Sequence, residues 1–101
     1  MNFSRNIQGN QMSVALAGKF TFPDNQVFRE LLNEAARLSQ PALEFDFDQV
    51  DFIDSAALGM LLVARDEVLK QGGHVTLKRP RGQVKKMFDI SRFSALFTVI
   101  D

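Results

Sequence analysis

The chain has 101 residues, no cysteine, and twelve basic side chains against twelve acidic ones. This length suits one domain with one hydrophobic core, so we predict a single domain over residues 1–101. The absence of cysteine excludes disulfides, thiolate metal sites and thiol catalysis, and it suits the cytosol. A formal net charge of zero creates no overall field that would draw the chain to nucleic acid or to a membrane surface.

Apolar stretches in this sequence are too short to cross a membrane. The longest one, Ala56–Ala64, covers about nine residues, whereas a bilayer needs ~20. Residues 1–6 lack the apolar core of a signal peptide. We therefore expect a cytoplasmic protein without membrane insertion.

The first half of the chain predicts a β-hairpin followed by a helix. Residues 3–8 and 12–17 have strand-like patterns on either side of a glycine–asparagine turn signal at 9–10. Apolar residues then recur at helical spacing from residue 27, and Pro41 is expected to stop this helix just after residue 40.

The second half predicts alternating strands and helices. Residues 43–47 alternate apolar and acidic side chains, which indicates a strand with one face in the core. The period then becomes helical until two glycines at 72–73. Residues 74–77 predict a short strand, residues 83–89 a third helix, and the tail 93–100 a helical turn and an edge strand. The predicted inward face of the second helix comprises Ala57, Leu58, Leu61, Leu62, Arg65, Val68 and Leu69.

The order of the predicted elements is β-β-α-β-α-β-α with a small tail. Strands that alternate with helices favour a sheet with parallel members, and an initial hairpin makes that sheet mixed. We therefore predict an α/β fold, in which a mixed sheet of four to five strands begins with a hairpin and is covered by three to four helices.

One segment carries more information than its secondary structure. A strand ends there, and the polar pair Asp54-Ser55 begins a helix whose first turn is rich in small residues. Either side chain can accept hydrogen bonds from the free N–H groups of that turn, so a helix cap is the plainest interpretation. However, Ala56, Ala57 and Gly59 leave the backbone accessible beside a hydroxyl, and glycine costs about 1 kcal/mol of helix stability relative to alanine. These features favour a functional role for Ser55.

The segment Phe52–Gly59 resembles the signature of the STAS domain, the family named for sulfate transporters and anti-sigma-factor antagonists. The resemblance covers nearly the whole chain. The strand end Leu16–Gly18, the turn Gln71–Val75 and the closing pair Leu96-Phe97 fall where that family would place them. Because the order of elements agrees as well, the resemblance implies a STAS-like fold.

The resemblance also implies a function for Ser55. In stand-alone bacterial members of the family, the serine at this position is phosphorylated by a partner that is both a serine kinase and an anti-sigma factor. The unphosphorylated protein binds this partner and frees the sigma factor. The phosphorylated form dissociates from the partner, and a serine phosphatase removes the phosphate. The resemblance thus implies a regulator that is not an enzyme, uses no cofactor and is a monomer or weak dimer. The partner-binding residues that it implies are Thr21, Asp54, Ser55, Ala56, Ala57, Leu58 and Gly59.

Two positions depart from the family pattern. The family usually has glycine at the position of Ala57, and it often has an acidic residue at the position of Thr21. Because Thr21 lies near the serine in the family fold, its departure bears on the local electrostatics and on which partner is recognised.

A second function lies within the same resemblance. Some STAS proteins are small accessory subunits that bind the ATPase of an ABC-type membrane transporter and are not kinase substrates. These proteins often carry threonine at the switch position. Ser55 preceded by Asp54 therefore favours the phosphorylation switch over the accessory subunit.

Catalytic alternatives lack their motifs. Ser55 does not lie in a Gly-x-Ser-x-Gly elbow, and the only histidine, His74, stands at the start of a predicted strand. The chain contains no P-loop sequence. We therefore predict no catalytic residue.

Two charged segments are interpreted as solvated surface. Aspartates crowd residues 46–54, but no glycine stands at the sharp-turn position and no glutamate closes a calcium loop, so we predict no metal site. The basic run in residues 78–86 has no interleaved aromatic residues, so we predict no nucleic-acid site.

Overall fold

The first two strands form the predicted hairpin. The computed structural model describes residues 1–101, and in it β1 (Asn2–Gln8) pairs antiparallel with β2 (Gln11–Phe20). The register leaves only residues 9 and 10 in the turn. Gly9 has a positive φ of 61° there, a conformation that glycine adopts without the steric cost that other residues meet.

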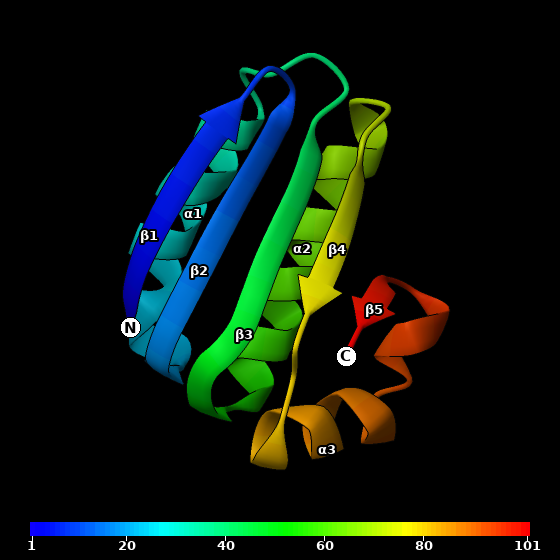
Figure 1. Cartoon of the computed structure of the whole chain (residues 1–101). Helices are drawn as coiled ribbons and strands as arrows, with labels where there is room; N and C mark the ends of the chain where they lie inside the picture. The colour runs from blue at the N-terminus through cyan, green and yellow to red at the C-terminus, as the bar shows by residue number, and fades with distance from the viewer.

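Three parallel strands extend the hairpin into a five-stranded mixed sheet. They are β3 (Ala42–Ile53), β4 (His74–Lys78) and β5 (Thr98–Ile100). The spatial order of the strands is β1-β2-β3-β4-β5 (Figure 1). The predicted α/β class, the mixed sheet and the initial hairpin are confirmed.

Three α-helices and two short 3₁₀ turns connect the strands. The helices are α1 (Asn25–Ala35), α2 (Ser55–Lys70) and α3 (Gly82–Ile90), and the 3₁₀ turns are η1 (Phe22–Asp24) and η2 (Phe93–Ala95). Helices α1 and α2 lie against one face of the sheet, while α3 stands beyond the end of β4 (Figure 1). None of the helices combines the length and the apolar content that crossing a bilayer requires.

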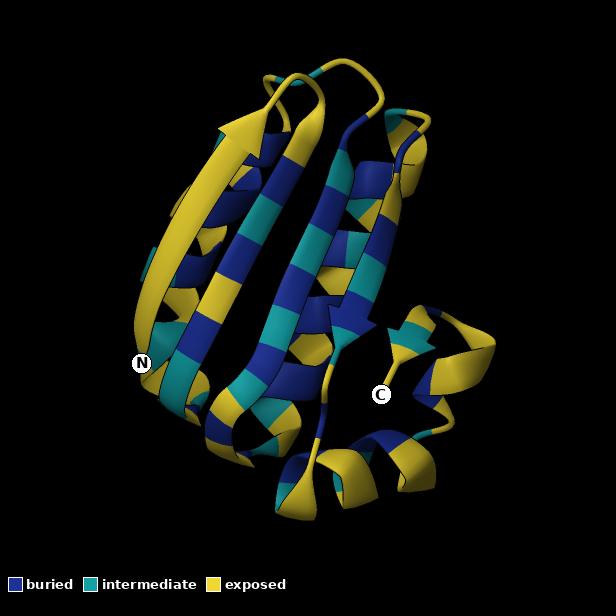
Figure 2. Ribbon diagram, in the orientation of Figure 1, coloured by how far each residue is buried: buried dark blue, intermediate teal, exposed yellow.

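The core lies between the sheet and the two helices that cover it. In β3, Leu43, Phe45 and Phe47 are buried and alternate with partly exposed acidic residues (Figure 2). Aromatic rings join the layers, because the ring centroid of Phe28 in α1 lies 5.3 Å from that of Phe45 and 5.2 Å from that of Phe20. This packing holds α1 against β2 and β3.

Helix α1 ends earlier than the sequence indicated. The prediction extended it to residue 40, but it stops at Ala35, and residues 36–40 form turns and bends. A residue before proline is disfavoured in the right-handed helical region, and Gln40 accordingly has a left-handed φ of 48°. Pro41 thus excludes Gln40 from a helix, whereas the end of α1 at Ala35 lies beyond the reach of this effect.

The buried face of α2 also differs from the predicted one. The prediction placed Leu62 and Leu69 inward, but their side chains are 37% and 46% exposed, whereas Met60 and Ala64 are buried. Because the sheet covers one side of α2 and α1 covers another, the buried stripe is centred between these two neighbours. The prediction from spacing alone was wrong about the centre of that stripe.

The other face of the sheet carries ion pairs. Lys78 Nζ lies 3.2 Å from Glu44 Oε1, and the Arg79 guanidinium pairs with Asp46. The hydrogen bond from Arg79 is the main cause that holds the pKa of Asp46 below its usual value, against the opposing effect of burial. The basic run that the sequence assigned to solvated surface therefore begins with residues paired to acidic side chains of β3.

Candidate partner-binding site

Asp54 occupies the junction between β3 and α2. Strand β3 continues beyond the predicted residue 47 because its pairing with β2 persists as far as Phe20 opposite Ile53. The Oδ1 atom of Asp54 accepts a hydrogen bond from the backbone N–H of Ala57 at 2.9 Å. The sequence left the helix cap open between Asp54 and Ser55, and the structure assigns it to Asp54.

The second carboxylate oxygen of Asp54 connects the turn η1 to the start of α2 through a hydrogen bond. Its Oδ2 atom accepts a hydrogen bond from the N–H of Phe22 at 3.1 Å. Thr21, one residue earlier, donates its own N–H to Asp24 Oδ2 at 2.8 Å, which stabilises the turn η1. The structure thus brings the segment that contains Thr21 beside the start of α2.

Ser55 is the first residue of α2, and it is exposed. Because Asp54 supplies the cap, the Ser55 hydroxyl is not needed for that role. The amino end of a helix carries a partial positive charge, which stabilises an anion placed there. A negative charge at this position is therefore compatible with the helix.

The small residues of the first turn divide between surface and core. Ala56 is half-buried and Gly59 is exposed, whereas the exposed fraction is 0% for Ala57 and 9% for Leu58. Helical geometry rotates successive residues by about 100°, so position 57 lies on nearly the opposite side of α2 from Ser55 and faces the core. Both side chains belong to the core, and the part that the sequence analysis assigned to Ala57 and Leu58 in partner binding stays a prediction.

A glutamine that no sequence pattern singled out is hydrogen-bonded to the same junction between β3 and α2. Gln83 in α3 accepts a hydrogen bond from the N–H of Ile53 at 2.9 Å and donates one to the carbonyl oxygen of Ile53 at 2.8 Å. Its side-chain amide therefore pairs with the end of β3 as a neighbouring strand would. No local pattern marks Gln83, because its partner lies 30 residues away along the chain.

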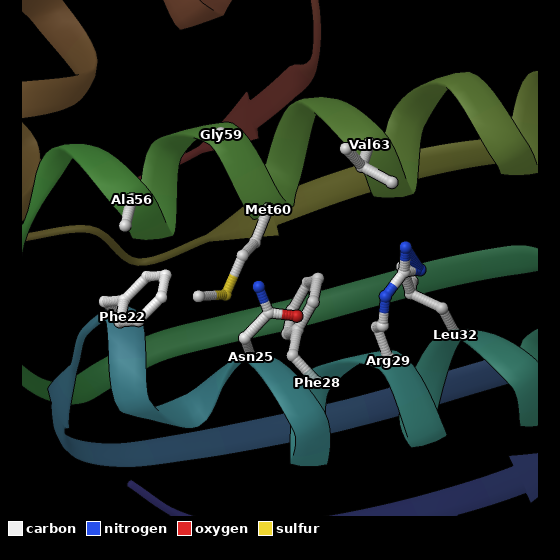
Figure 3. A pocket seen from close by; sticks show the side chains of 9 residues that line it. All are labelled: Phe22, Asn25, Phe28, Arg29, Leu32, Ala56, Gly59, Met60 and Val63. Atoms are coloured by element: carbon white, nitrogen blue, oxygen red, sulfur yellow. The ribbon is translucent and has the colours of Figure 1, made fainter.

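A groove of about 330 Å³ lies between α1 and α2, next to Ser55. Phe22 and Ala56 stand at one end of it, and Arg29, Leu32 and Val63 stand at the other (Figure 3). We call this feature the α1–α2 groove. No sequence pattern marks this groove, because its two walls come from separate helices whose packing creates the space.

Removing the Ser55 hydroxyl should barely affect stability. We expect Ser55→Ala to lower the free energy of unfolding by less than about 1 kcal/mol, because Asp54 retains the cap. Asp54→Ala should cost about 2 kcal/mol, since it removes the cap and leaves the Phe22 N–H without its acceptor. Asp54→Asn is the matched control, because asparagine also caps helices well. Urea unfolding of the four proteins measures these costs, and an equal loss for Ser55→Ala and Asp54→Ala would show that Ser55 is mainly structural.

Comparison with known proteins relates this geometry to a family. Residues 2–101 match the family model of the STAS domain. A STAS-domain containing protein of Pseudomonas aeruginosa (strain UCBPP-PA14) is 30% identical over 91 residues, which cover 90% of this chain and 89% of that protein.

Solved structures share the fold at low sequence identity. The anti-sigma factor antagonist SpoIIAA in its unphosphorylated form matches with a TM-score of 0.79 and 17% identity, covering 99% of this chain and 88% of that one. The phosphorylated form of SpoIIAA, from Bacillus, matches with a TM-score of 0.76 and 18% identity, covering 97% and 90%. A sulfate transporter family protein of Wolinella succinogenes matches with a TM-score of 0.77 and 15% identity, covering 95% and 80%. These likenesses show the fold, and the family-model match over nearly the full length shows that the chain belongs to the STAS-domain family.

Proposed function

We propose that this chain is an anti-sigma-factor antagonist that acts by partner switching. The unphosphorylated chain binds a partner that is both a serine kinase and an anti-sigma factor, phosphorylation of Ser55 releases the partner, and a serine phosphatase restores the binding form. The observation that carries this proposal is the exposed Ser55 at the start of α2, next to an aspartate that already supplies the helix cap. Ser55 is thus accessible to a kinase and dispensable for the helix.

Phosphorylation at this position suits a switch that leaves the fold intact. A phosphate adds about −1.5 to −2 charges, and the helix dipole stabilises an anion at this end of α2. The fold that this chain shares with SpoIIAA in both its unphosphorylated and its phosphorylated form supports this expectation. A docked partner surface, in contrast, meets a charge without a counter-ion, which can cost several kcal/mol.

The proposed role is binding and not catalysis. The only histidine, His74, pairs with Ala42 at the start of β3, whereas Ser55 follows the end of the same strand. The 12 residues of this strand separate the two side chains by much of the molecule's longest extent of 33 Å, so the histidine cannot activate the serine. In this proposal Ser55 is the substrate of a kinase, and the chain acts on its signalling partners in the cytoplasm.

Mass spectrometry of the protein purified from its native cell tests the proposal directly. We expect a fraction of the molecules to carry phosphate, and the phosphate to lie on Ser55. The alternative, an accessory subunit of an ABC-type transporter, predicts an unmodified Ser55 in every growth condition and co-purification with the transporter ATPase. That pair of results would overturn the switch.

An arginine at position 56 should block the partner without disturbing the fold. Ala56 is half-buried beside Ser55, so a long charged side chain there covers the proposed contact. We expect Ala56→Arg to weaken partner binding by at least about tenfold with an unchanged circular dichroism spectrum. Leu69→Arg is the matched control, because Leu69 is 46% exposed near the opposite end of α2. Equal affinities for the two variants would place the contact elsewhere.

A further inference from the structure

We propose that the α1–α2 groove binds an amphipathic helix of the partner, with an apolar side chain beside Phe22 and a carboxylate on Arg29. The inference rests on the proposed function, because it names the chemistry that the partner presents next to Ser55. The features described above concern the amino end of α2, whereas this surface continues from there to Val63 in α2 and Leu32 in α1 (Figure 3).

The groove is apolar and open at the end near Ser55. The side chain of Phe22 is 65% exposed, although the hydrogen bond from its N–H to Asp54 holds its backbone in place. Val63, which is 43% exposed, lines the same groove, and a contiguous apolar surface of this kind is typical of a contact that another molecule covers. Gly59 and Ala56 provide the space in front of the Phe22 ring, because a Cβ added at Gly59 would meet no atom within 4 Å.

The opposite end of the groove carries a positive charge without a counter-ion. Arg29 is the only charged side chain in the lining, and it takes part in none of the ion pairs within the chain. Arg5 of β1, in contrast to Arg29, has a counter-ion within the chain. Its Nε atom lies 2.8 Å from Oε1 of Glu34 in α1. A partner carboxylate would supply the missing counter-ion, and charge complementarity of this kind selects the partner.

The length of the groove sets the spacing of the two contacts. From Ala56 to Val63, α2 advances seven residues, or about 10 Å. On a partner helix packed along the groove, the apolar residue and the carboxylate therefore stand at positions i and i+7, with small or apolar residues at i+3 and i+4. Such a helix places its apolar residue at the end of the groove near Ser55, so a phosphate on Ser55 would stand against the apolar end of the segment that the groove binds.

Peptide selection tests this inference without the kinase. A phage-displayed library of helical peptides of about 16 residues is selected on the full unphosphorylated chain and counter-selected on Phe22→Ala, an exposed position whose substitution spares the core. We expect the enriched peptides to carry a large apolar residue and, seven positions later, aspartate or glutamate. Fluorescence anisotropy of one labelled peptide then measures its affinity.

Charge reversal provides the decisive comparison. Arg29→Glu should lower the affinity of the chain for the peptide by about tenfold or more. Replacing the acidic residue of the peptide with lysine should restore binding to that variant. Arg37→Glu is the matched control, since Arg37 is exposed and lies outside the groove. No enrichment over the Phe22→Ala background, a consensus without an acidic residue, or equal effects of the two arginine variants would each overturn the inference. Because no step uses phosphate, failure here leaves the Ser55 switch standing, and an unphosphorylated Ser55 in the cell leaves the groove result standing.

Discussion

Phosphorylation of Ser55 should lower the affinity of the chain for its kinase partner by about 100-fold or more, a loss of nearly 3 kcal/mol. The exposed hydroxyl stands at the surface where the partner is proposed to dock, and a buried phosphate would face the partner without a counter-ion. Ser55→Ala keeps shape and charge but cannot accept phosphate, so it should bind constitutively. Ser55→Asp adds about one of the nearly two charges of a phosphate and should therefore be a partial mimic.

An affinity titration of all four forms gives the test. The expected order runs from unmodified serine and alanine, through aspartate, to phosphoserine. Added salt should reduce the differences in affinity among the four forms only modestly, because charges that are desolvated in a complex are weakly screened. Equal affinities for the phosphorylated and unmodified chains would rule out the switch and favour the transporter subunit. Melting curves of the two forms serve as the control, since the helix dipole should keep the fold stable in both.

Gly73→Ala should lower the free energy of unfolding by about 3 kcal/mol or more. A Cβ at Gly73 would stand 2.9 Å from the Pro41 nitrogen and closer still to its carbonyl oxygen. That oxygen cannot easily move away, because it accepts the backbone hydrogen bond from His74 at 3.0 Å that begins the pairing of β4. The overlap must therefore displace the start of β4 from β3.

The same substitution at Gly59 is the matched control and should have the opposite sign. Gly59 lies within α2, and a methyl group there meets no atom within 4 Å, so alanine should stabilise the helix by about 0.5–1 kcal/mol. The added methyl also narrows the α1–α2 groove, so partner affinity should fall while stability rises. Thermal and urea unfolding measure the change in stability of both variants. Destabilisation by Gly59→Ala would show that the groove has no room for the added methyl group.

Local sequence patterns determined most of the elements and the position of the candidate site. Alternation indicated β3, and the helical period indicated α2, because both patterns arise from the geometry of consecutive residues. The Asp54-Ser55 pair could be located for the same reason, since a cap bonds backbone groups only a few residues away. The sequence could not choose between these two side chains as the cap, because either one reaches the first turn.

Only the tertiary structure decided what surrounds Ser55. The bond from Phe22 to Asp54 joins residues 32 apart, and those from Gln83 to Ile53 join residues 30 apart. The free Arg29 and the buried Ala57 likewise depend on how α1 and α2 pack against each other and the sheet. Periodicity reports which side of an element is apolar and does not specify the element that covers it. The register of the parallel strands and the packing of the two helices bring these distant residues together, and no local sequence pattern encodes either of them.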